Sequence, residues 1–205
     1  MIHDLSVQLV SAWHDTSWVE LLAAALALAY VPLAIGQRLS CWAAAFVSSV
    51  LYVWVFFSAR LYMESALNAF FAAMAVYGFW QWRHGSEGSV LAVSRWPPLR
   101  HALALMGIVA LAGVNAFFLA RFTPAANPFI DSLLTWSSVF TTFLVARKVY
   151  ENWYWWLLID STSVCLYFTR HLYLTMLLYC VYVVLCVIGM REWRRSLPSA
   201  AYAAA

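Results

Sequence analysis

Charged side chains are scarce in this sequence. Only 10% of its 205 residues are Asp, Glu, Lys or Arg, whereas 65% are hydrophobic, and the mean hydropathy is +0.76. A soluble globular domain typically carries about 25% charged residues. The composition therefore excludes an ordinary soluble domain and predicts a chain whose solvent is the lipid bilayer.

The sequence also lacks the short patterns that mark most enzymes and metal sites. No H-E-x-x-H, G-x-S-x-G, Walker or dinucleotide-binding motif occurs. The four cysteines form no C-x-x-C or Cys/His pattern and fall in or beside apolar runs, so we interpret them as small core residues. The net charge of +3 is spread between the apolar runs and gives no nucleic-acid-binding patch. We expect neither an enzyme nor a bound cofactor or metal.

Long apolar runs are abundant. A helix that crosses the hydrocarbon core needs roughly 20 mostly apolar residues. Seven segments qualify, at 18–36, 42–59, 64–82, 101–120, 129–146, 153–169 and 172–190. The longest gap between them, residues 83–100, holds Gly, Ser and Pro residues that predict a loop. The expected fold class is an all-α integral membrane protein with seven transmembrane helices.

The distribution of Lys and Arg predicts how these helices are oriented, because basic residues favour cytoplasmic loops. With seven spans, the two termini lie on opposite sides of the membrane. Nine basic residues fall on one side: Arg38, Arg83, Arg95, Arg100, Arg147, Lys148, Arg191, Arg194 and Arg195. Only Arg60, Arg121 and Arg170 fall on the other. We predict that the N-terminus lies outside and the C-terminus in the cytoplasm.

The chain resembles itself at an offset of 111 residues. This offset pairs Trp42 with Trp153 and Trp82 with Trp193. Nine of the 41 positions from 42 to 82 are identical to their counterparts, where so biased a composition gives roughly three by chance. The repeated unit is therefore three helices, and the fourth helix lies between the two copies.

This repeat divides the chain into five parts. They are an N-terminal segment (1–17), a first three-helix repeat (18–82), a linker with the fourth helix (83–128), a second three-helix repeat (129–193) and a C-terminal tail (194–205). Three helices plus one return the chain to its starting side, so the two repeats are parallel. Parallel repeats are a transporter architecture, with substrate held at the repeat interface. The alternative is a duplicated helical bundle that transports nothing.

The sixth segment carries a polar and aromatic stripe inside the membrane. At 100° per residue, five side chains fall within an arc of about 80°. They are Trp153, Trp156, Asp160, Ser163 and Tyr167. Because ionisable groups in hydrocarbon usually face a cavity or a partner, we interpret the stripe as the lining of a ligand site. The alternative is an acid paired to a neighbouring helix for packing. Trp155 points away from the stripe and is expected to anchor at the lipid interface.

Other segments supply polar residues that could complete this site. The candidates are Asn68, Thr135, Ser138 and Tyr179, with Thr142, Thr175 and Tyr182 on the same helices. An amide such as Asn68 could equally serve helix packing. The first repeat has Ala45 and Ser49 where the second has Trp156 and Asp160, so we expect one asymmetric site. Aromatic faces, a carboxylate and hydroxyls suit a nucleoside-like ligand with a planar cationic ring.

These residues resemble those of a known family. The pattern W-x-x-W-x-x-x-D at Trp153, Trp156 and Asp160 resembles the W-x-x-W-x-x-x-N/D signature of the PnuC family of bacterial vitamin transporters. "YGFWQW" at 77–82 and "GMREW" at 189–193 also resemble that family, over roughly residues 18–195. The resemblance implies a fold similar to a full-length SWEET transporter, usually assembled as a homotrimer in the bacterial inner membrane.

The function that this resemblance implies is uptake of nicotinamide riboside by facilitated diffusion, with the product trapped by cytosolic phosphorylation. Trp153 and Trp156 would then lie beside the nicotinamide ring, and Asp160 would be the signature polar residue. Members that carry thiamine or riboflavin resemble one another closely, so a carrier of another vitamin is an alternative. A non-transporting membrane scaffold is a second one.

Overall fold

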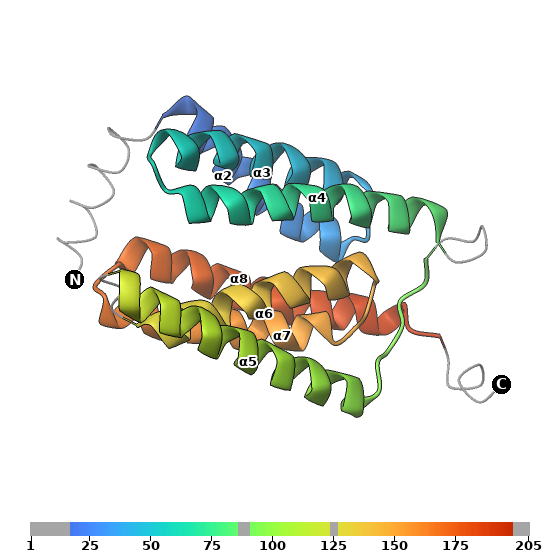
Figure 1. Ribbon diagram of the computed structural model, residues 1–205. Coiled ribbons are helices and arrows are strands. Elements are labelled where there is room, and N and C mark those ends of the chain that lie inside the picture. The colour runs from blue at the N-terminus through green and yellow to red at the C-terminus, as the bar shows by residue number, and fades with distance from the viewer. Residues whose placement is uncertain (1–16, 86–90, 124–126, 199–205) are drawn as a thin grey trace.

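The computed structural model describes residues 17–85, 91–123 and 127–198. Most of these residues lie in helices (Figure 1): α2 (Trp18–Ile35), α3 (Ser40–Ser58), α4 (Tyr62–His84), α5 (Pro98–Phe122), α6 (Pro128–Ala146), α7 (Asn152–Thr169) and α8 (Tyr173–Arg195). Each helix corresponds to one of the seven predicted segments, so the all-helical prediction is confirmed for this part of the chain.

Some helices run further than the apolar segments that predicted them. α4 continues to His84 rather than ending at 82, and α8 continues to Arg195 rather than 190. The last turns of both helices are basic, and cations are favourable at a helix C-terminus. The hydropathy of a sequence identifies only the apolar part of a helix that lies in the hydrocarbon core. The helical backbone hydrogen bonds continue past the end of that apolar part.

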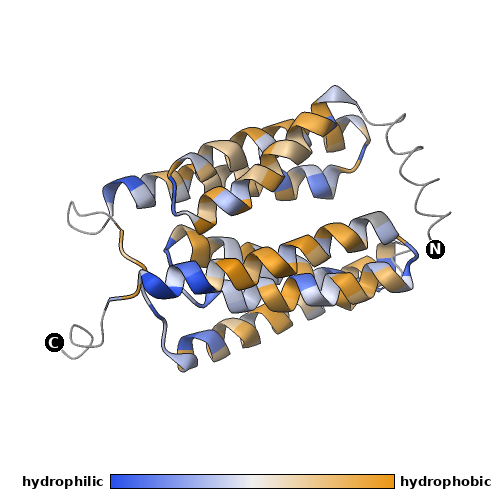
Figure 2. Ribbon diagram, turned by 180° about the vertical axis from the view of Figure 1, so that it is seen from behind, coloured by the Kyte–Doolittle hydropathy of each residue, from blue (hydrophilic) through white to orange (hydrophobic). Residues whose placement is uncertain are grey.

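Five of the described helices are long and apolar enough to cross a membrane: α2, α3, α5, α6 and the Thr175–Arg195 part of α8. In Figure 2 the apolar residues form a band along the helices, with hydrophilic residues toward their ends. α4 and α7 are not among the five. Polar side chains lower the mean hydropathy of both helices, such as Asn68 in α4 and Asp160 and Ser163 in α7.

The helices form two layers (Figure 1). In the first layer, α3 contacts both α2 and α4. In the second, α7 contacts both α6 and α8, and α5 packs on α6. The layers meet where α2 contacts α8 and where α4 contacts α6.

Backbone features recur at the 111-residue offset. Gln37 and Lys148 have φ of 51° and 48°, and Arg60 and His171 have φ of 61° and 58°. Each follows the end of a helix, where a residue in the left-handed region closes the last turn. In all four cases the next amide N–H donates to the carbonyl five residues earlier, at 2.8–3.0 Å. A residue other than glycine costs roughly 1–2 kcal/mol in this conformation. The same costly turn therefore occurs at equivalent positions in both layers.

Side-chain packing also recurs at this offset. The Trp42 and Trp82 rings are 5.4 Å apart at 88°, and so are the Trp153 and Trp193 rings. A Cβ atom on Gly78 would lie under 3.0 Å from the Trp42 indole, and a Cβ on Gly189 would meet Trp153 in the same way. The identical residues therefore build the same indole-on-glycine contact twice.

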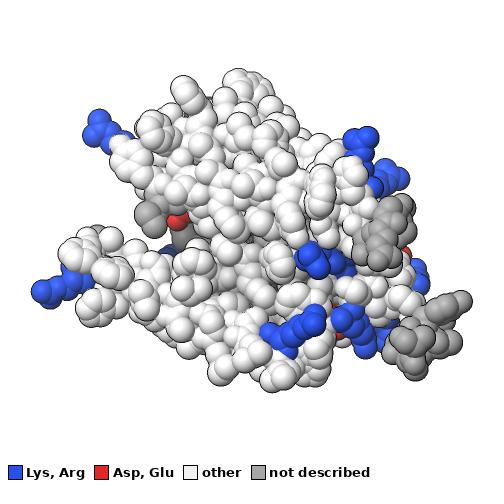
Figure 3. Space-filling model, turned by 45° about the vertical axis from the view of Figure 1, so that its right-hand side comes forward, with Lys and Arg blue, Asp and Glu red and all other residues white. Residues whose placement is uncertain are grey.

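The buried core lies at one end of the helices. The four tryptophans 42, 82, 153 and 193 are 0–4% exposed. They sit where α2, α4, α6 and α8 end and where α3 and α7 begin. Figure 3 shows Lys and Arg at two opposite ends of the molecule, with the larger group at one of them. We call the end that holds the tryptophans and the turns at Arg38 and Lys148 the basic end.

Candidate functional site

A cavity of about 430 Å³ lies between the two layers. The first layer contributes Ala27, Tyr30, Val31, Ala34, Tyr52 and Phe71. The second contributes Ser138, Val145, Trp153, Trp156, Ile159, Asp160, Tyr179, Tyr182 and Cys186. Its volume falls in the range of small-molecule pockets, about 300–1,000 Å³. The lining is mostly apolar and aromatic with a few polar groups, as in sites that bind a planar organic ligand.

Asp160 is the one acid in this lining. It lies one helical turn after Trp156 on α7 and is 5% exposed. Its Oδ2 accepts a hydrogen bond from the Cys186 thiol at 3.3 Å. Within the described part of the chain, no Lys, Arg or His forms an ion pair with it. A buried carboxylate without a cationic partner is costly in an apolar environment, so this position favours a positively charged ligand.

Two acids outside the cavity have structural partners. Asp131 pairs with Arg170 at 3.3 Å. Glu20 accepts from the Ser17 backbone N–H at 2.7 Å, which completes the capping box that begins α2. These two carboxylates are satisfied within the fold, and neither lines the cavity.

Four tyrosines from the two layers line the same cavity as Asp160. Tyr30 and Tyr52 come from the first layer, and Tyr179 and Tyr182 come from the second. A phenol can both donate and accept a hydrogen bond. The cavity therefore combines hydroxyl groups for a polar part of a ligand with the indole face of Trp156 for a ring.

Five of the predicted site residues line the cavity. They are Trp153, Trp156, Asp160, Ser138 and Tyr179. Trp153 belongs both to the cavity wall and to the indole-on-glycine contact at the basic end. Ser138 donates to the Leu134 carbonyl at 2.8 Å, so its oxygen is left to accept.

The other four predicted residues do not line the cavity. Asn68 donates to the Glu64 carbonyl at 2.9 Å, and Thr135 donates to the Asp131 carbonyl at 2.9 Å. Both are thus partly satisfied within their own helices, as short polar side chains often are. Ser163 is buried at 3% exposure outside the lining, and the Tyr167 ring packs on Tyr179 with centroids 5.2 Å apart.

Tyr30, Tyr52, Phe71 and Cys186 were not expected from the sequence as site residues. Cys186 was expected to be a small core residue; it is indeed buried, at 3% exposure, but it also faces the cavity and contacts Asp160. On α8 it stands seven residues after Tyr179, with Tyr182 between them, which is the spacing of one helix face. That spacing is the signal that could have identified it.

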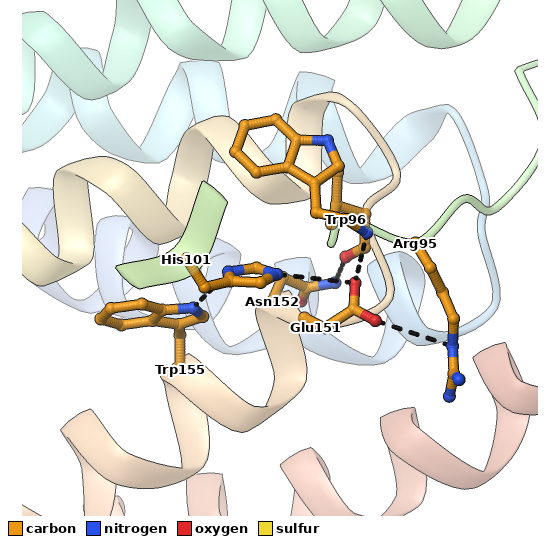
Figure 4. Close-up of polar contacts among 7 residues, drawn as sticks. Arg95, Trp96, His101, Glu151, Asn152 and Trp155 are labelled. Atoms are coloured by element: carbon orange, nitrogen blue, oxygen red, sulfur yellow. Dashed lines mark hydrogen bonds and ion pairs between the residues drawn. The ribbon is translucent and has the colours of Figure 1, made fainter. Parts of the chain in front are cut away.

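Trp155 points away from the cavity and contacts two other helices, whereas its expected place at the lipid interface stays a prediction. Its Nε1 donates to His101 Nδ1 at 3.2 Å, as Figure 4 shows. Its ring also lies edge-on to Phe140, with centroids 5.2 Å apart. Trp155 therefore joins α7 to α5 and α6.

Glu151, just before α7, completes this junction (Figure 4). Its carboxylate accepts from the Trp96 backbone N–H at 3.2 Å and lies 3.6 Å from Arg95 Nε and 3.9 Å from His101 Nε2. Because His101 Nδ1 accepts from Trp155, the Nε2 atom carries the proton that faces Glu151. These contacts hold residues 95–101 against the start of α7 and so fix the helix that carries Trp156 and Asp160.

No three His, Cys, Asp or Glu side chains gather as a metal site within residues 17–85, 91–123 and 127–198.

The chain is similar in sequence to two known transporters. The chain is 27% identical over 209 residues to the nicotinamide riboside transporter PnuC of Escherichia coli, with 89% of this chain and 87% of that protein covered. It is 26% identical over 181 residues to the riboflavin/roseoflavin transporter RibM of Streptomyces davaonensis, with 86% and 84% covered.

Among solved structures, the chain is similar in fold to the vitamin B3 transporter PnuC, with a TM-score of 0.69, 20% identity and coverage of 95% of this chain and 88% of that one. The profile described as nicotinamide mononucleotide transporter matches residues 17–195. The resemblance seen in the tryptophan signature is thereby confirmed: this multi-pass membrane protein belongs to the nicotinamide mononucleotide transporter family, the family of PnuC, whose members are transporters and not enzymes.

Proposed function

We propose that this chain takes up nicotinamide riboside by facilitated diffusion and that phosphorylation in the cytosol traps the product. The observation that carries the proposal is the buried Asp160 carboxylate, which has no cationic partner among the described residues and lies beside Trp156 in the cavity. Nicotinamide riboside has a positively charged planar ring, which suits both an indole face and a carboxylate. Its ribose hydroxyls suit the surrounding tyrosines.

The riboside fits the lining better than the mononucleotide does. No Lys, Arg or His lies among the lining residues, and the only charged one is acidic. A phosphate placed there would lack the basic partners that phosphate sites normally supply and would face Asp160. The substrate we propose is therefore the dephosphorylated form.

The second candidate is a carrier of another vitamin. The similarity to RibM favours riboflavin, and the aromatic lining would accept its flat ring system. Riboflavin is neutral, so it would leave Asp160 without a charged partner. Thiamine carries a cationic ring and satisfies the same charge argument, which makes it a necessary competitor in any binding test.

The architecture we propose is a 3+1+3 parallel repeat, similar to a full-length SWEET transporter. α2–α4 form one unit (18–82), α6–α8 form the other (129–193), and α5 lies in the linker. The recurrence of turns, tryptophans and glycines at the 111-residue offset supports this division. The distribution of basic residues supports a cytoplasmic C-terminus in a bacterial inner membrane. Assembly as a homotrimer follows from the family resemblance alone.

Purified protein in liposomes tests this function with labelled nicotinamide riboside. We expect saturable uptake that stops when the concentrations inside and outside are equal and that does not respond to imposed Na⁺ or proton gradients. The mononucleotide, riboflavin and thiamine serve as competitors, and the first two should compete poorly. Uptake no greater than that of empty liposomes would refute the proposal.

A further inference from the structure

The floor of the cavity at the basic end is bonded to two tryptophans from opposite layers. Ala34 and Val145 line the cavity, and they are equivalent positions in the repeat. The Ala34 carbonyl accepts from Trp193 Nε1, and the Val145 carbonyl accepts from Trp82 Nε1, both at 3.1 Å. Each indole thus reaches from its own layer to the other. The centroids of the two rings lie 6.1 Å apart and the ring planes are tilted by 57°, so the indoles pack on each other beneath the floor.

A second pair of equivalent residues meets beside these indoles. Lys148 Nζ donates to Gln37 Oε1 at 3.2 Å and lies 4.6 Å from the centre of the Trp82 ring. Lys148 is 4% exposed, and burial lowers its pKa. Gln37 also donates to Ser196 at 2.9 Å, which adds a further bond between the layers. While the layers are in contact, the buried ammonium therefore takes its hydrogen-bond acceptor and its aromatic partner from the opposite layer.

Two contacts between described residues at the opposite end stay within one layer. Arg170 pairs with Asp131 inside the second layer, at 3.3 Å. The Phe57 ring packs on Tyr62 inside the first, with centroids 5.5 Å apart. The bonds between layers that involve Trp82, Trp193 and Lys148 are therefore features of the basic end.

The two partners of the Gln37–Lys148 contact belong to different rigid groups. The turn that carries Lys148 is bound to the segment before α5: Ser94 N–H donates to the Lys148 carbonyl at 3.0 Å, and Tyr150 N–H donates to the Ser94 carbonyl at 2.8 Å. Since α5 packs on α6, Lys148 is fixed to the α5–α8 layer. Gln37 follows α2 and is fixed to the α2–α4 layer.

From these contacts we infer that Gln37 and Lys148 are gate residues for transport, which close the cavity at the basic end together with Trp82 and Trp193. Substrate leaves by this end when the α2–α4 layer moves against the α5–α8 layer and the Gln37–Lys148 contact breaks. The inference rests on the proposed transport function, because a gate requires a transported substrate.

A reversible cross-link tests the gate directly. In the double variant Gln37→Cys/Lys148→Cys, a short bifunctional methanethiosulfonate reagent should join the two layers. We expect the cross-link to lower nicotinamide riboside uptake into liposomes at least tenfold, with recovery after reduction. Binding of the riboside in detergent should stay within about threefold of the untreated protein. The single variants, treated in the same way, control for reaction at the native cysteines.

The outcomes separate the gate from the proposed function. If the wild-type protein does not bind or transport the riboside, the proposed function fails. If transport is normal but the cross-linked protein still transports at the untreated rate, the gate inference is wrong. Loss of binding together with uptake on cross-linking would also overturn it, since the contact would then belong to the binding site itself.

Labelling of a native thiol gives a second, independent test. Cys186 lies in the cavity, so a membrane-impermeant thiol reagent should reach it from the basic side only through the gate. We expect Lys148→Ala to speed this labelling at least fivefold, whereas Arg38→Ala, at the exposed position beside Gln37, should not. Equal labelling rates in the two variants would contradict a gate at Lys148.

Discussion

The two three-helix groups share their packing at the basic end but differ in the cavity. Trp42, Gly78 and Trp82 are repeated as Trp153, Gly189 and Trp193, with matching ring geometry. In the cavity, Trp156 and Asp160 stand where the first group has Ala45 and Ser49. Cys186 likewise stands where the first group has Ala75. The duplicated packing thus holds a site whose charge and whose Trp156 indole come from one copy.

The largest effects on stability should come from disrupting the indole-on-glycine contacts that the two copies share. In Gly78→Ala or Gly189→Ala, the added methyl would overlap the facing indole. Overpacking of this kind costs about 1–3 kcal/mol, so both variants should melt well below the wild type in detergent, and by similar amounts. Gly107→Ala is the matched control, because no atom lies within 4 Å of its added methyl. If Gly189→Ala melts at the same temperature as Gly107→Ala, the claim that the two copies share this contact is contradicted.

The next effect should appear in only one copy. Trp156→Ala removes the indole face from the cavity and should weaken nicotinamide riboside binding by about 1–3 kcal/mol, the scale of base–aromatic stacking. Isothermal titration in detergent measures it. Trp155→Phe keeps the packing on Phe140 and should leave affinity nearly unchanged. Equal losses in the two variants would mean that α7 matters as a whole rather than through its cavity face.

A third change removes only the charge. Asp160→Asn keeps the size of the side chain and should weaken riboside binding roughly tenfold, or about 1.4 kcal/mol, while riboflavin binding should not fall. Asp131→Asn is the control, since that acid pairs with Arg170 outside the cavity. Competition binding with both vitamins provides the measurement. A uniform loss for both vitamins would indicate a packing role for Asp160.

The smallest expected effect concerns the thiol that orients this acid. Cys186→Ser keeps a donor toward Asp160 and should stay within about threefold of wild-type affinity. Cys186→Ala removes the donor and should lose about 0.5–1.5 kcal/mol, as for a typical hydrogen bond. Identical affinities for the two variants, measured by the same titration, would show that the Cys186–Asp160 bond has no part in binding.

Much of this arrangement can be predicted from the sequence because it depends on the spacing of residues along the chain. The 111-residue offset anticipates that Trp153 has a counterpart in Trp42, and the helical arc separates Trp156 from Trp155. An arc on one helix does not say how deep the cavity extends or which neighbour faces it. That is why Ser163 and Tyr167 share the face of Asp160 yet lie outside the lining.

Other features depend on contacts between distant segments. Tyr30 and Tyr52 line the cavity because the first layer packs across it. No local pattern of polar residues predicts this packing. The His101–Trp155 bond joins residues 54 positions apart and makes Trp155 part of a junction between α5 and α7. The sequence also could not show that Asn68 and Thr135 bond to their own helices, because that depends on side-chain rotamers.

The central claim is that the site selects a positive charge on the ligand ring. The most direct test compares nicotinamide riboside with its dihydro form, which has nearly the same shape but a neutral ring, by titration against the wild type and Asp160→Asn. We predict that the wild type binds the charged form at least tenfold more tightly and that Asp160→Asn loses most of this preference. Equal affinity of the wild type for the two forms would contradict the claim.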